Sequence, residues 1–387
     1  MIETIEDAAG FEKLRDEWDA LLETSASNCF FLTWEWLYPW WKHLSGDRTL
    51  RIVTLRSGGE LVAIAPLASR PRRLARLVPF QSLEFIGADK VCSDYLDLII
   101  KRGREPEALD MLAEHLSREM LMIEMANVRR NSLAAELTAE LERYGWSPSE
   151  ETIGVCPFTI LTGHSWQSYL ASLGSEHRYN FRRRLKNIGK IARVRFEEAR
   201  SPAQAQHMLE ALVALHNMRW RDRGGSDAFD TPDLIAFHEE VTQLALDRGW
   251  LRLYLLTLDD RPAAALYGFH YHATFYFMQA GFDPAYRKQS VGLLAMGLAI
   301  QHAIDEGMDE CDMLRGDEAY KFHWARERRE LGRLELYPPR RSALLYKRAQ
   351  AMGRAGKTAV LRTLPMVDRT ATSRSDNDVR DLRPLQH

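Results

Sequence analysis

A long stretch without charge near the middle of the second half of the chain constrains the fold most. From Pro262 to Phe282 the sequence has no Asp, Glu, Lys or Arg. A segment of this length could cross a bilayer as a helix. It carries two histidines, a glutamine and several aromatic residues, however, and this favours two buried β-strands over a membrane span. We therefore expect the core of a sheet here, in a protein that is cytoplasmic or at most peripheral to a membrane.

The size and charge of the chain limit the classes of protein that it can represent. Its 387 residues are 45% hydrophobic and 27% charged, with a formal net charge of −2. This length indicates two or three domains, and the near-zero charge argues against a dedicated DNA-binding protein. Four cysteines stand isolated, with no zinc-finger spacing, which indicates a reducing compartment without disulfides. The acidic start, Met1 to Gly10, has no apolar core typical of a secretory signal.

Hydrophobic periodicity predicts helices followed by strands twice along the chain, so we expect two α+β domains, each a mixed sheet flanked by helices. The predicted units are residues 1–162, residues 163–340, and a C-terminal segment 341–387 with a basic helix near Ser342–Leu361 and a disordered tail. Predicted helices cover Phe11–Leu22, Trp34–Leu44, Glu105–Arg118, Ser132–Tyr144, Ser165–Leu173, Glu176–Ile191, Pro202–Arg221, Pro232–Arg248 and Gly292–Glu306, with another starting at Glu318. Predicted strands cover Leu50–Arg56, Leu61–Ser69, Tyr95–Ile100, Leu121–Met125, Arg193–Glu197, Trp250–Leu258, Ala263–Tyr271, Thr274–Gly281, Glu310–Leu314 and Arg333–Tyr337.

Several common catalytic motifs are missing from the sequence. It has no phosphate-binding P-loop, dinucleotide fingerprint, nucleophile elbow or H-E-x-x-H pair. His270 and His272 fall on one face of a predicted strand and could ligate a metal, but no third ligand has suitable spacing. We favour core histidines and expect no metal.

The junction between a predicted strand and the helix after Ser290 is the first candidate site. Arg287 and Lys288 precede the turn, and Gly292 lies where the helix begins. Free N–H groups and the dipole at a helix start favour a bound phosphate or pyrophosphate. The alternative is an ordinary loop in which the glycine only permits a sharp bend. The candidate anion-binding residues are Arg287, Lys288, Gln289, Ser290, Val291, Gly292 and Leu293.

A second candidate site follows the strand predicted at Glu310–Leu314. Proton donors and acceptors crowd the turn after the strand: Asp317, Glu318, Tyr320, Lys321 and His323. Active sites of α/β sheets often lie at such strand ends. Alternatively, Asp317 caps a helix and Lys321 pairs with Glu318.

Three further segments have both functional and structural interpretations. Eight cations and no acid lie between His177 and Phe196, Arg178 and Arg182 among them, with Phe181, Leu185, Ile188 and Ala192 as the expected buried stripe. They could bind an anionic substrate or form a solvated face. Trp34, with Leu37, Trp40 and Trp41 at helical spacing, could stack on a sugar or belong to the core. The basic stretch from Arg340 to Leu364 could contact an anionic membrane or remain in solvent.

Four sequence segments together resemble a known family. They are His177–Leu185, Gly281–Pro284, Ser290–Leu294 and Leu314–Lys321, and the opening Phe30–Leu37 is similar as well. Their order resembles the CelD/BcsL-like acetyltransferases within the GNAT and FemAB-like superfamily. The resemblance implies two tandem GNAT-like domains and acyl transfer from acetyl-coenzyme A as co-substrate. Gln289 to Leu294 fits the GNAT pyrophosphate loop [RQ]-x-x-G-x-[GA] except at Leu294, where GNAT enzymes have a small residue.

The resemblance also implies a mechanism and a biological setting. Tyr320 corresponds to the tyrosine that protonates the leaving thiolate, with Asp317 and Lys321 beside it as further catalytic candidates. The base stays open among Asp317, Glu318, His270 and Asp283. The expected acceptor is a small molecule or saccharide of bacterial envelope or exopolysaccharide biosynthesis, contacted by Arg178, Arg182 and Trp34. The alternatives are a FemAB-type transferase that uses aminoacyl-tRNA, and a non-catalytic scaffold of a polysaccharide-synthesis complex.

Overall fold

Two antiparallel strands occupy the uncharged stretch. The computed structural model describes residues 1–74, 78–88, 91, 93–221 and 226–348. In it, β10 (Arg261–Tyr271) pairs with β11 (Thr274–Phe282), and every β10 residue from Ala263 onward is buried. Burial on both faces of the strand explains the lack of charge, because an unpaired charge would be costly there. The expectation of two buried strands is confirmed. None of the helices in the described part has the length and apolarity needed to cross a membrane.

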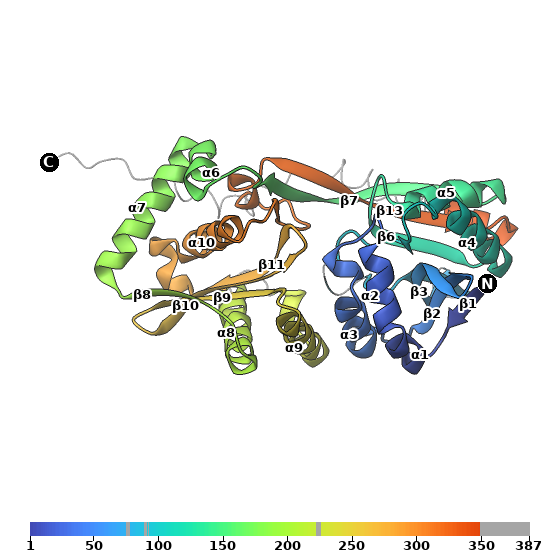
Figure 1. The fold of residues 1–387 in the computed structure, drawn as a ribbon, viewed down its shortest axis with the longest axis horizontal. Helices are drawn as coiled ribbons and strands as arrows, with labels where there is room; N and C mark the ends of the chain where they lie inside the picture. Colours follow the sequence, from blue (N-terminus) through green and yellow to red (C-terminus); the bar gives the residue numbers. More distant parts are fainter. Residues whose placement is uncertain (75–77, 89–90, 92, 222–225, 349–387) are drawn as a thin grey trace.

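The described strands form one sheet of 13 strands, in the order β1-β2-β3-β4-β6-β13-β7-β12-β11-β10-β9-β8 with β5 beside β3 (Figure 1). Two neighbouring pairs, β4·β6 and β11·β12, are parallel and the others are antiparallel. The remaining strands are β1 (Ile2–Ile5), β2 (Thr49–Ser57), β3 (Glu60–Leu74), β4 (Val78–Phe85), β5 (Ile99–Ile100), β6 (Met122–Arg129), β7 (Ser147–Ile160), β8 (Val194–Glu198), β9 (Leu251–Leu258), β12 (Glu310–Asp312) and β13 (Glu327–Tyr337).

Helices cover both faces of this sheet. In the second half α8 and α9 lie on one face, while α6, α7 and α10 lie on the other (Figure 1). The helices are α1 (Ala8–Lys13), α2 (Arg15–Glu23), α3 (Trp34–Leu44), α4 (Glu105–Glu119), α5 (Leu133–Arg143), α6 (Trp166–Ser172), α7 (Ser175–Ile191), α8 (Pro202–Trp220), α9 (Pro232–Asp247) and α10 (Val291–Asp305), followed by a helix at residues 341–348. The layout confirms the expected α+β class, in which mixed strands are flanked by helices in both halves.

The two halves share strands across the expected boundary after residue 162. Strand β13 comes from the end of the second half, yet it inserts between β6 and β7. The last residues of β7, Phe158–Ile160, pair in turn with β12. The ladder of hydrogen bonds therefore runs from one half into the other without a break.

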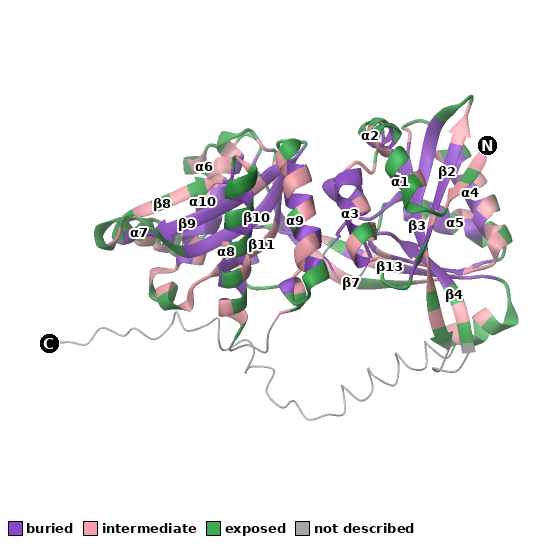
Figure 2. Ribbon diagram, turned by 90° about the horizontal axis from the view of Figure 1, so that it is seen from below, coloured by how far each residue is buried: buried purple, intermediate pink, exposed green. Residues whose placement is uncertain are grey.

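Aromatic packing also joins the halves beneath the sheet. Phe30 stacks on Phe269 of β10 with ring centroids 3.8 Å apart, and Trp36 of α3 meets Phe237 of α9 edge-on. In Figure 2 the facing sides of α3 and α9 and the strands β9 and β10 are buried. This continuous apolar contact accounts for the tryptophan-rich sequence of α3, which fills core space.

Five elements differ between the sequence-based expectation and the structure: three strands that were missed, one strand that is shorter and one helix that does not form. Strand β7 was not expected, because its first half is polar and charged and shows no hydrophobic alternation. The strand expected over Tyr95–Ile100 is paired only at Ile99–Ile100, and no α-helix starts at Glu318, where only the 3₁₀ turn η5 (Lys321–His323) forms. Strands β1 and β4 were also missed. Most of the C-terminal helix expected near Ser342–Leu361 lies outside the described residues.

Candidate functional site

An opening between β11 and β12 is the starting point of the site. The two parallel strands pair only over Thr274–Tyr276 and Glu310–Asp312. From Phe277 onward no described strand pairs with that edge of β11. A register shift against β10 leaves Met278 as a bulge, because Tyr267 pairs with Gln279 while Gly268 pairs with Phe277. Bulges bend a strand and often lie beside active sites. The bent, open edge exposes backbone polar groups to a ligand.

The start of α10 lies next to the end of this open strand. Asp283 accepts a hydrogen bond from Ala285 N–H at 2.8 Å and begins the 3₁₀ turn η4 (Pro284–Gln289). Ser290 then adopts a left-handed conformation with φ of 56°, and its side chain does not cap α10. The first N–H groups of a helix lack intrahelical partners, so they are available to an anion. A Cβ on Gly292 would lie 3.4 Å from the ring of Phe282.

The other candidate residues of this junction fall into two groups. Arg287 and Lys288 are exposed on η4, and the Lys288 carbonyl accepts a hydrogen bond from Arg184 of α7. Val291 is buried, as is Leu294, which departs from the GNAT pattern. The Leu294 side chain packs into the core on the inner face of α10, and therefore does not lie over the helix start.

A cavity of about 190 Å³ brings residues of both candidate segments together. Tyr320 lines it together with Gly292 and Leu293. The rest of its wall is largely apolar and comes from β10, β11, α10, the ends of α7 and α8, and the turn η5: His177, Arg219, Ala265, Phe277, Ala280, Gly281, Phe282, Ala295, Met296, His323 and Trp324. A cavity with an apolar body and a few converging polar groups is the usual form of a small-molecule site.

Two histidines line this cavity, and neither was among the residues predicted as the base. The rings of His177 and His323 stack with centroids 5.2 Å apart, and Trp324 meets His177 edge-on at 4.5 Å. Burial, aided by the neighbouring His323, lowers the pKa of His177 to about 4. His177 is therefore neutral at pH 7, and among the described residues its buried Nε2 has no hydrogen-bond partner. A neutral imidazole can accept a hydrogen bond, but a pKa this low makes His177 a weak base.

Arg219 places a cation at the same cavity. Its guanidinium lies 5.2 Å from the Phe282 ring centroid and 5.8 Å from that of Tyr320. Arg219, His177 and His323 come from α8, α7 and the turn after β12. Nothing in the local sequence distinguished Arg219. His177 opened one of the segments that carried the family resemblance, and His323 belonged to the polar cluster predicted after the Glu310–Leu314 strand.

Lys321 holds the loop after β12 in place. It is 4% exposed, and its ammonium donates to the carbonyls of Leu314 and Arg315 at 3.3 and 2.8 Å. It also pairs with Glu318 at 3.1 Å, as expected from the sequence. Asp317 is exposed and begins no helix, so its interpretation as a helix cap is wrong. The structure thus gives Lys321 a positioning contact with the backbone.

The expected bases other than Glu318 and Asp317 are engaged elsewhere. His270 is buried and pairs with Glu306 at 2.6 Å, while His272 contacts Glu23 and Asn28 of the first half. The Asp283 side chain caps η4.

The predicted substrate residues are spread over the molecule. Arg178 donates to the Ala171 carbonyl at 2.7 Å, whereas Arg182 is exposed on α7. Trp34 lies in the first half, 5% exposed, where it stacks on Tyr38 and donates to the Phe11 carbonyl. The structure does not bring Trp34 to the cavity.

Some of the cations in and after α7 form ion pairs within the protein. Arg193 and Arg195 both pair with Asp260 of the β9–β10 turn, which corrects the view of eight unpaired cations. Phe181 and Ile188 form the buried stripe, but Leu185 is 37% exposed because it lies on the outer side of the helix.

Comparison with known proteins gives a family for the segment that builds the cavity. Residues 175–322 match the family model described as an acetyltransferase (GNAT) domain. Comparison with curated protein sequences finds no significant match. This part of the chain therefore resembles GNAT acyltransferases in sequence.

Solved structures share the overall fold at low sequence identity. FemX aligns with a TM-score of 0.60 and 13% identity, over 86% of this chain and 96% of FemX. L-PGS from Bacillus licheniformis aligns at 0.51 and 12%, over 86% and 94%. The C-terminal domain of a putative lysylphosphatidylglycerol synthetase from Agrobacterium fabrum aligns at 0.51 and 12%, over 89% and 97%. These likenesses establish a common two-part fold.

Proposed function

We propose that this chain is an acetyl-coenzyme A-dependent N- or O-acyltransferase of the CelD/BcsL-like type that acts in envelope or exopolysaccharide biosynthesis. The observation that carries the proposal is the convergence of the uncapped α10 start, the open edge of β11 and Tyr320 on one cavity. The match of residues 175–322 to the GNAT domain supports the same reaction class.

The residues present fit the donor that this reaction needs. The free N–H groups of α10 and the cations of Arg287 and Lys288 suit the diphosphate of coenzyme A. The apolar wall formed by Phe277, Phe282 and Leu293 suits an acyl-thioester with little charge.

The proposed chemistry is a direct transfer. The acceptor nitrogen or oxygen attacks the thioester carbonyl, and the proton that it loses passes to the imidazole of His323, which lines the cavity beside His177. The carbon–sulfur bond then breaks, and Tyr320 donates its hydroxyl proton to the leaving thiolate. N–H groups on the open edge of β11 stabilise the oxyanion formed in between. Lys321 acts by fixing the loop that carries Tyr320.

Isothermal titration with acetyl-coenzyme A tests the donor site. Gly292→Asp places a carboxylate at the second residue of α10, where it would repel the diphosphate, and we expect affinity to fall about 30-fold or more. Ala203→Asp is a matched control, because it adds the same charge at the second residue of α8 on an exposed surface. No heat from folded wild-type protein, or unchanged binding by Gly292→Asp, would contradict the proposal.

Aminoacyl-tRNA is the alternative donor. The shared fold with FemX and the exposed cations Arg182, Lys186 and Lys190 on α7 favour it. This alternative predicts binding of charged tRNA that weakens steeply with salt, and no binding of acetyl-coenzyme A. A scaffold without catalytic function would bind neither donor.

A further inference from the structure

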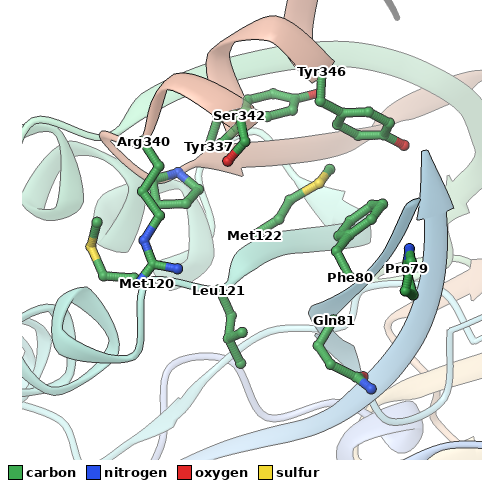
Figure 3. A pocket seen from close by; sticks show the side chains of 12 residues that line it. Pro79, Phe80, Gln81, Met120, Leu121, Met122, Tyr337, Arg340, Ser342 and Tyr346 are labelled. Carbon is green, nitrogen blue, oxygen red and sulfur yellow. The ribbon is translucent and has the colours of Figure 1, made fainter.

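A second cavity, an apolar groove of about 370 Å³, lies in the first half of the molecule and belongs to neither the donor loop nor the Tyr320 cavity. Most of its wall is aromatic, proline or thioether-containing (Figure 3). Figure 3 shows Met122 and Phe80 on its floor and side, with Tyr346 of the 341–348 helix above them. The lining residues are Pro79, Phe80, Gln81, Met120, Leu121, Met122, Tyr337, Pro338, Arg340, Ser342, Ala343 and Tyr346.

The groove exists because two parallel strands separate. Strands β4 and β6 pair only over Ser82–Glu84 and Met122–Glu124. Pro79 to Gln81 and Met120 to Leu121 precede this pairing and diverge, so their side chains form opposite walls. Methionine and aromatic walls adapt to flexible apolar ligands.

The helix at residues 341–348 closes one side of the groove and is anchored there. Lys347 donates to the Ser147 hydroxyl and the Pro148 carbonyl, both at 2.6 Å. The Tyr346 ring lies 5.1 Å from that of Phe80, edge to face. The helix is therefore part of the groove wall, and these contacts fix the position of its exposed residues relative to the groove.

One arginine lines the groove, and three more are exposed on the segments that border it. Arg340 lines the groove, while Arg341 and Arg348 are exposed on the same helix. Arg73 is exposed on β3 directly opposite Pro79, and cross-strand partners project from the same face. From Pro338 to Arg348 the sequence contains no acid. An apolar groove with a cationic mouth complements a ligand that has an apolar chain and an anionic head.

Two leucines project outward beside these arginines. Leu344 is 41% exposed and Leu345 is 62% exposed. A short helix that presents exposed leucines next to arginines has the character of a membrane-interface segment, where the leucines enter the lipid and the arginines meet its phosphates.

We propose that this groove binds one acyl chain of an anionic phospholipid, with Arg340 and Arg341 on the lipid phosphate and the 341–348 helix lying in the membrane interface. The occupant is a phospholipid because the groove is apolar within and cationic at its mouth, and because the exposed leucines lie beside it. Lipid binding in this groove does not depend on acyl transfer, so it can be tested separately from the proposed function.

The first test uses monomeric lipid and the full-length protein. Isothermal titration compares dihexanoyl phosphatidic acid with glycerol 3-phosphate, which has the head alone, and with dihexanoyl phosphatidylcholine, which has the chains and no net charge. We expect phosphatidic acid to bind about tenfold or more tightly than either, since both chain burial and phosphate contact contribute. Equal binding of glycerol 3-phosphate would show a phosphate site only and overturn the proposal.

Variants distinguish the contribution of the groove to lipid binding from that of the arginines. Ser342→Trp puts an indole into the groove from an exposed helix position, so lipid binding should be lost while the melting temperature is unchanged. Arg340→Ala with Arg341→Ala should weaken flotation with phosphatidylserine vesicles about 30-fold, at roughly fivefold for each cation near an anionic surface. Arg102→Ala, an exposed arginine at the β5–α4 turn, is the charge control and should behave as wild type.

Two outcomes would reject the proposal. One is phosphatidic acid binding that survives Ser342→Trp in a protein that melts normally. The other is a rise of about tenfold or more in lipid affinity when residues 349–387 are removed, because the chain's own C-terminal segment would then be the natural occupant of the groove.

Discussion

At the scale of single residues, the cavity depends on side chains whose ordinary behaviour is changed by burial. His177 is neutral because desolvation lowers its pKa to about 4, and the buried Lys321 directs its ammonium to backbone carbonyls and Glu318. Tyr320, Gly292 and Leu293 were predicted from the sequence and share one cavity. Their roles could be predicted because a tyrosine hydroxyl can donate a proton, and a helix start offers free N–H groups, whatever the surrounding fold.

Tyr320→Phe should lower kcat by about 100-fold and leave the affinity for coenzyme A unchanged, because only the proton given to the thiolate is lost. Steady-state kinetics together with titration of coenzyme A would check this. Tyr144→Phe, on an exposed surface of the first half, is the matched control. A loss of coenzyme A affinity equal to the loss of kcat would mean that Tyr320 binds the donor and does not act as an acid.

A buried histidine should make the fold sensitive to mild acid. Complete burial lowers the pKa of His238 from 6.5 to about 3, so the folded state resists a proton that the unfolded state accepts. Its contribution to stability is complete above pH 6.5 and is lost as pH falls toward 3, with a cost of about 2 kcal/mol at pH 5. Carboxyl groups with a raised pKa, such as Asp97 with a pKa of about 7, stabilise the folded state as the pH falls. They are present in both the wild type and the variant, so they cancel in the comparison.

Urea unfolding at pH 7.5 and pH 5.0 measures the contribution of His238 to the free energy of unfolding. His238→Phe keeps the aromatic contacts with Phe229 and Tyr267, and its stability relative to wild type should rise by about 2 kcal/mol on acidification. His207→Gln, which changes an exposed histidine of α8, should show no such rise. An equal response of the two variants would contradict the assigned cause.

At the scale of elements, the site depends on how closely α7 and α10 approach each other. Gly297 lies where Phe181 of α7 packs on α10, and a Cβ there would be 2.2 Å from the Phe181 ring. The sequence predicted both helices and the buried Phe181 but gave no sign that they cross at Gly297. Helix periodicity identifies a buried face, whereas the identity of the partner on that face is a property of the assembled layers.

Gly297→Ala should therefore destabilise the protein by about 2 kcal/mol, since overpacking outweighs the gain in helix propensity. It should also displace His177 at the cavity. Gly292→Ala is the matched control in the same helix, because its Cβ would meet Phe282 only at 3.4 Å and should be tolerated. Thermal unfolding measures both, and equal stabilities would show that Phe181 rotates away freely.

At the scale of the whole molecule, the two halves share one sheet and one apolar layer. Strand β13 completes the sheet of the first half, and Phe30 stacks on Phe269 across the two halves. In the sequence, Phe30 opens the segment Phe30–Leu37 that resembles the family, but nothing there indicated its partner. Its partner is 239 positions away, and no local pattern encodes a contact at that separation.

Phe30→Ala should lower the free energy of unfolding by about 3–5 kcal/mol and should shift one cooperative transition for the entire molecule. Differential scanning calorimetry would show this as a single peak at lower temperature. Tyr144→Ala, at an exposed end of α5, should leave the peak in place. Two separate peaks, only one of which moves, would mean that the halves unfold independently.

The sequence alone determined the elements whose signal is local: the buried strand pair in the uncharged stretch, the helices with a clear 3.6-residue period, and the glycine and tyrosine segments of the candidate site. Tertiary structure decided what depends on partners distant in the chain. It placed β13 in the first half, moved Trp34 into the core, joined His177 to His323, and used Lys321 to hold a loop. The physical reason is that propensity and periodicity act over a few residues, while pairing, burial and pKa arise only when separate segments meet.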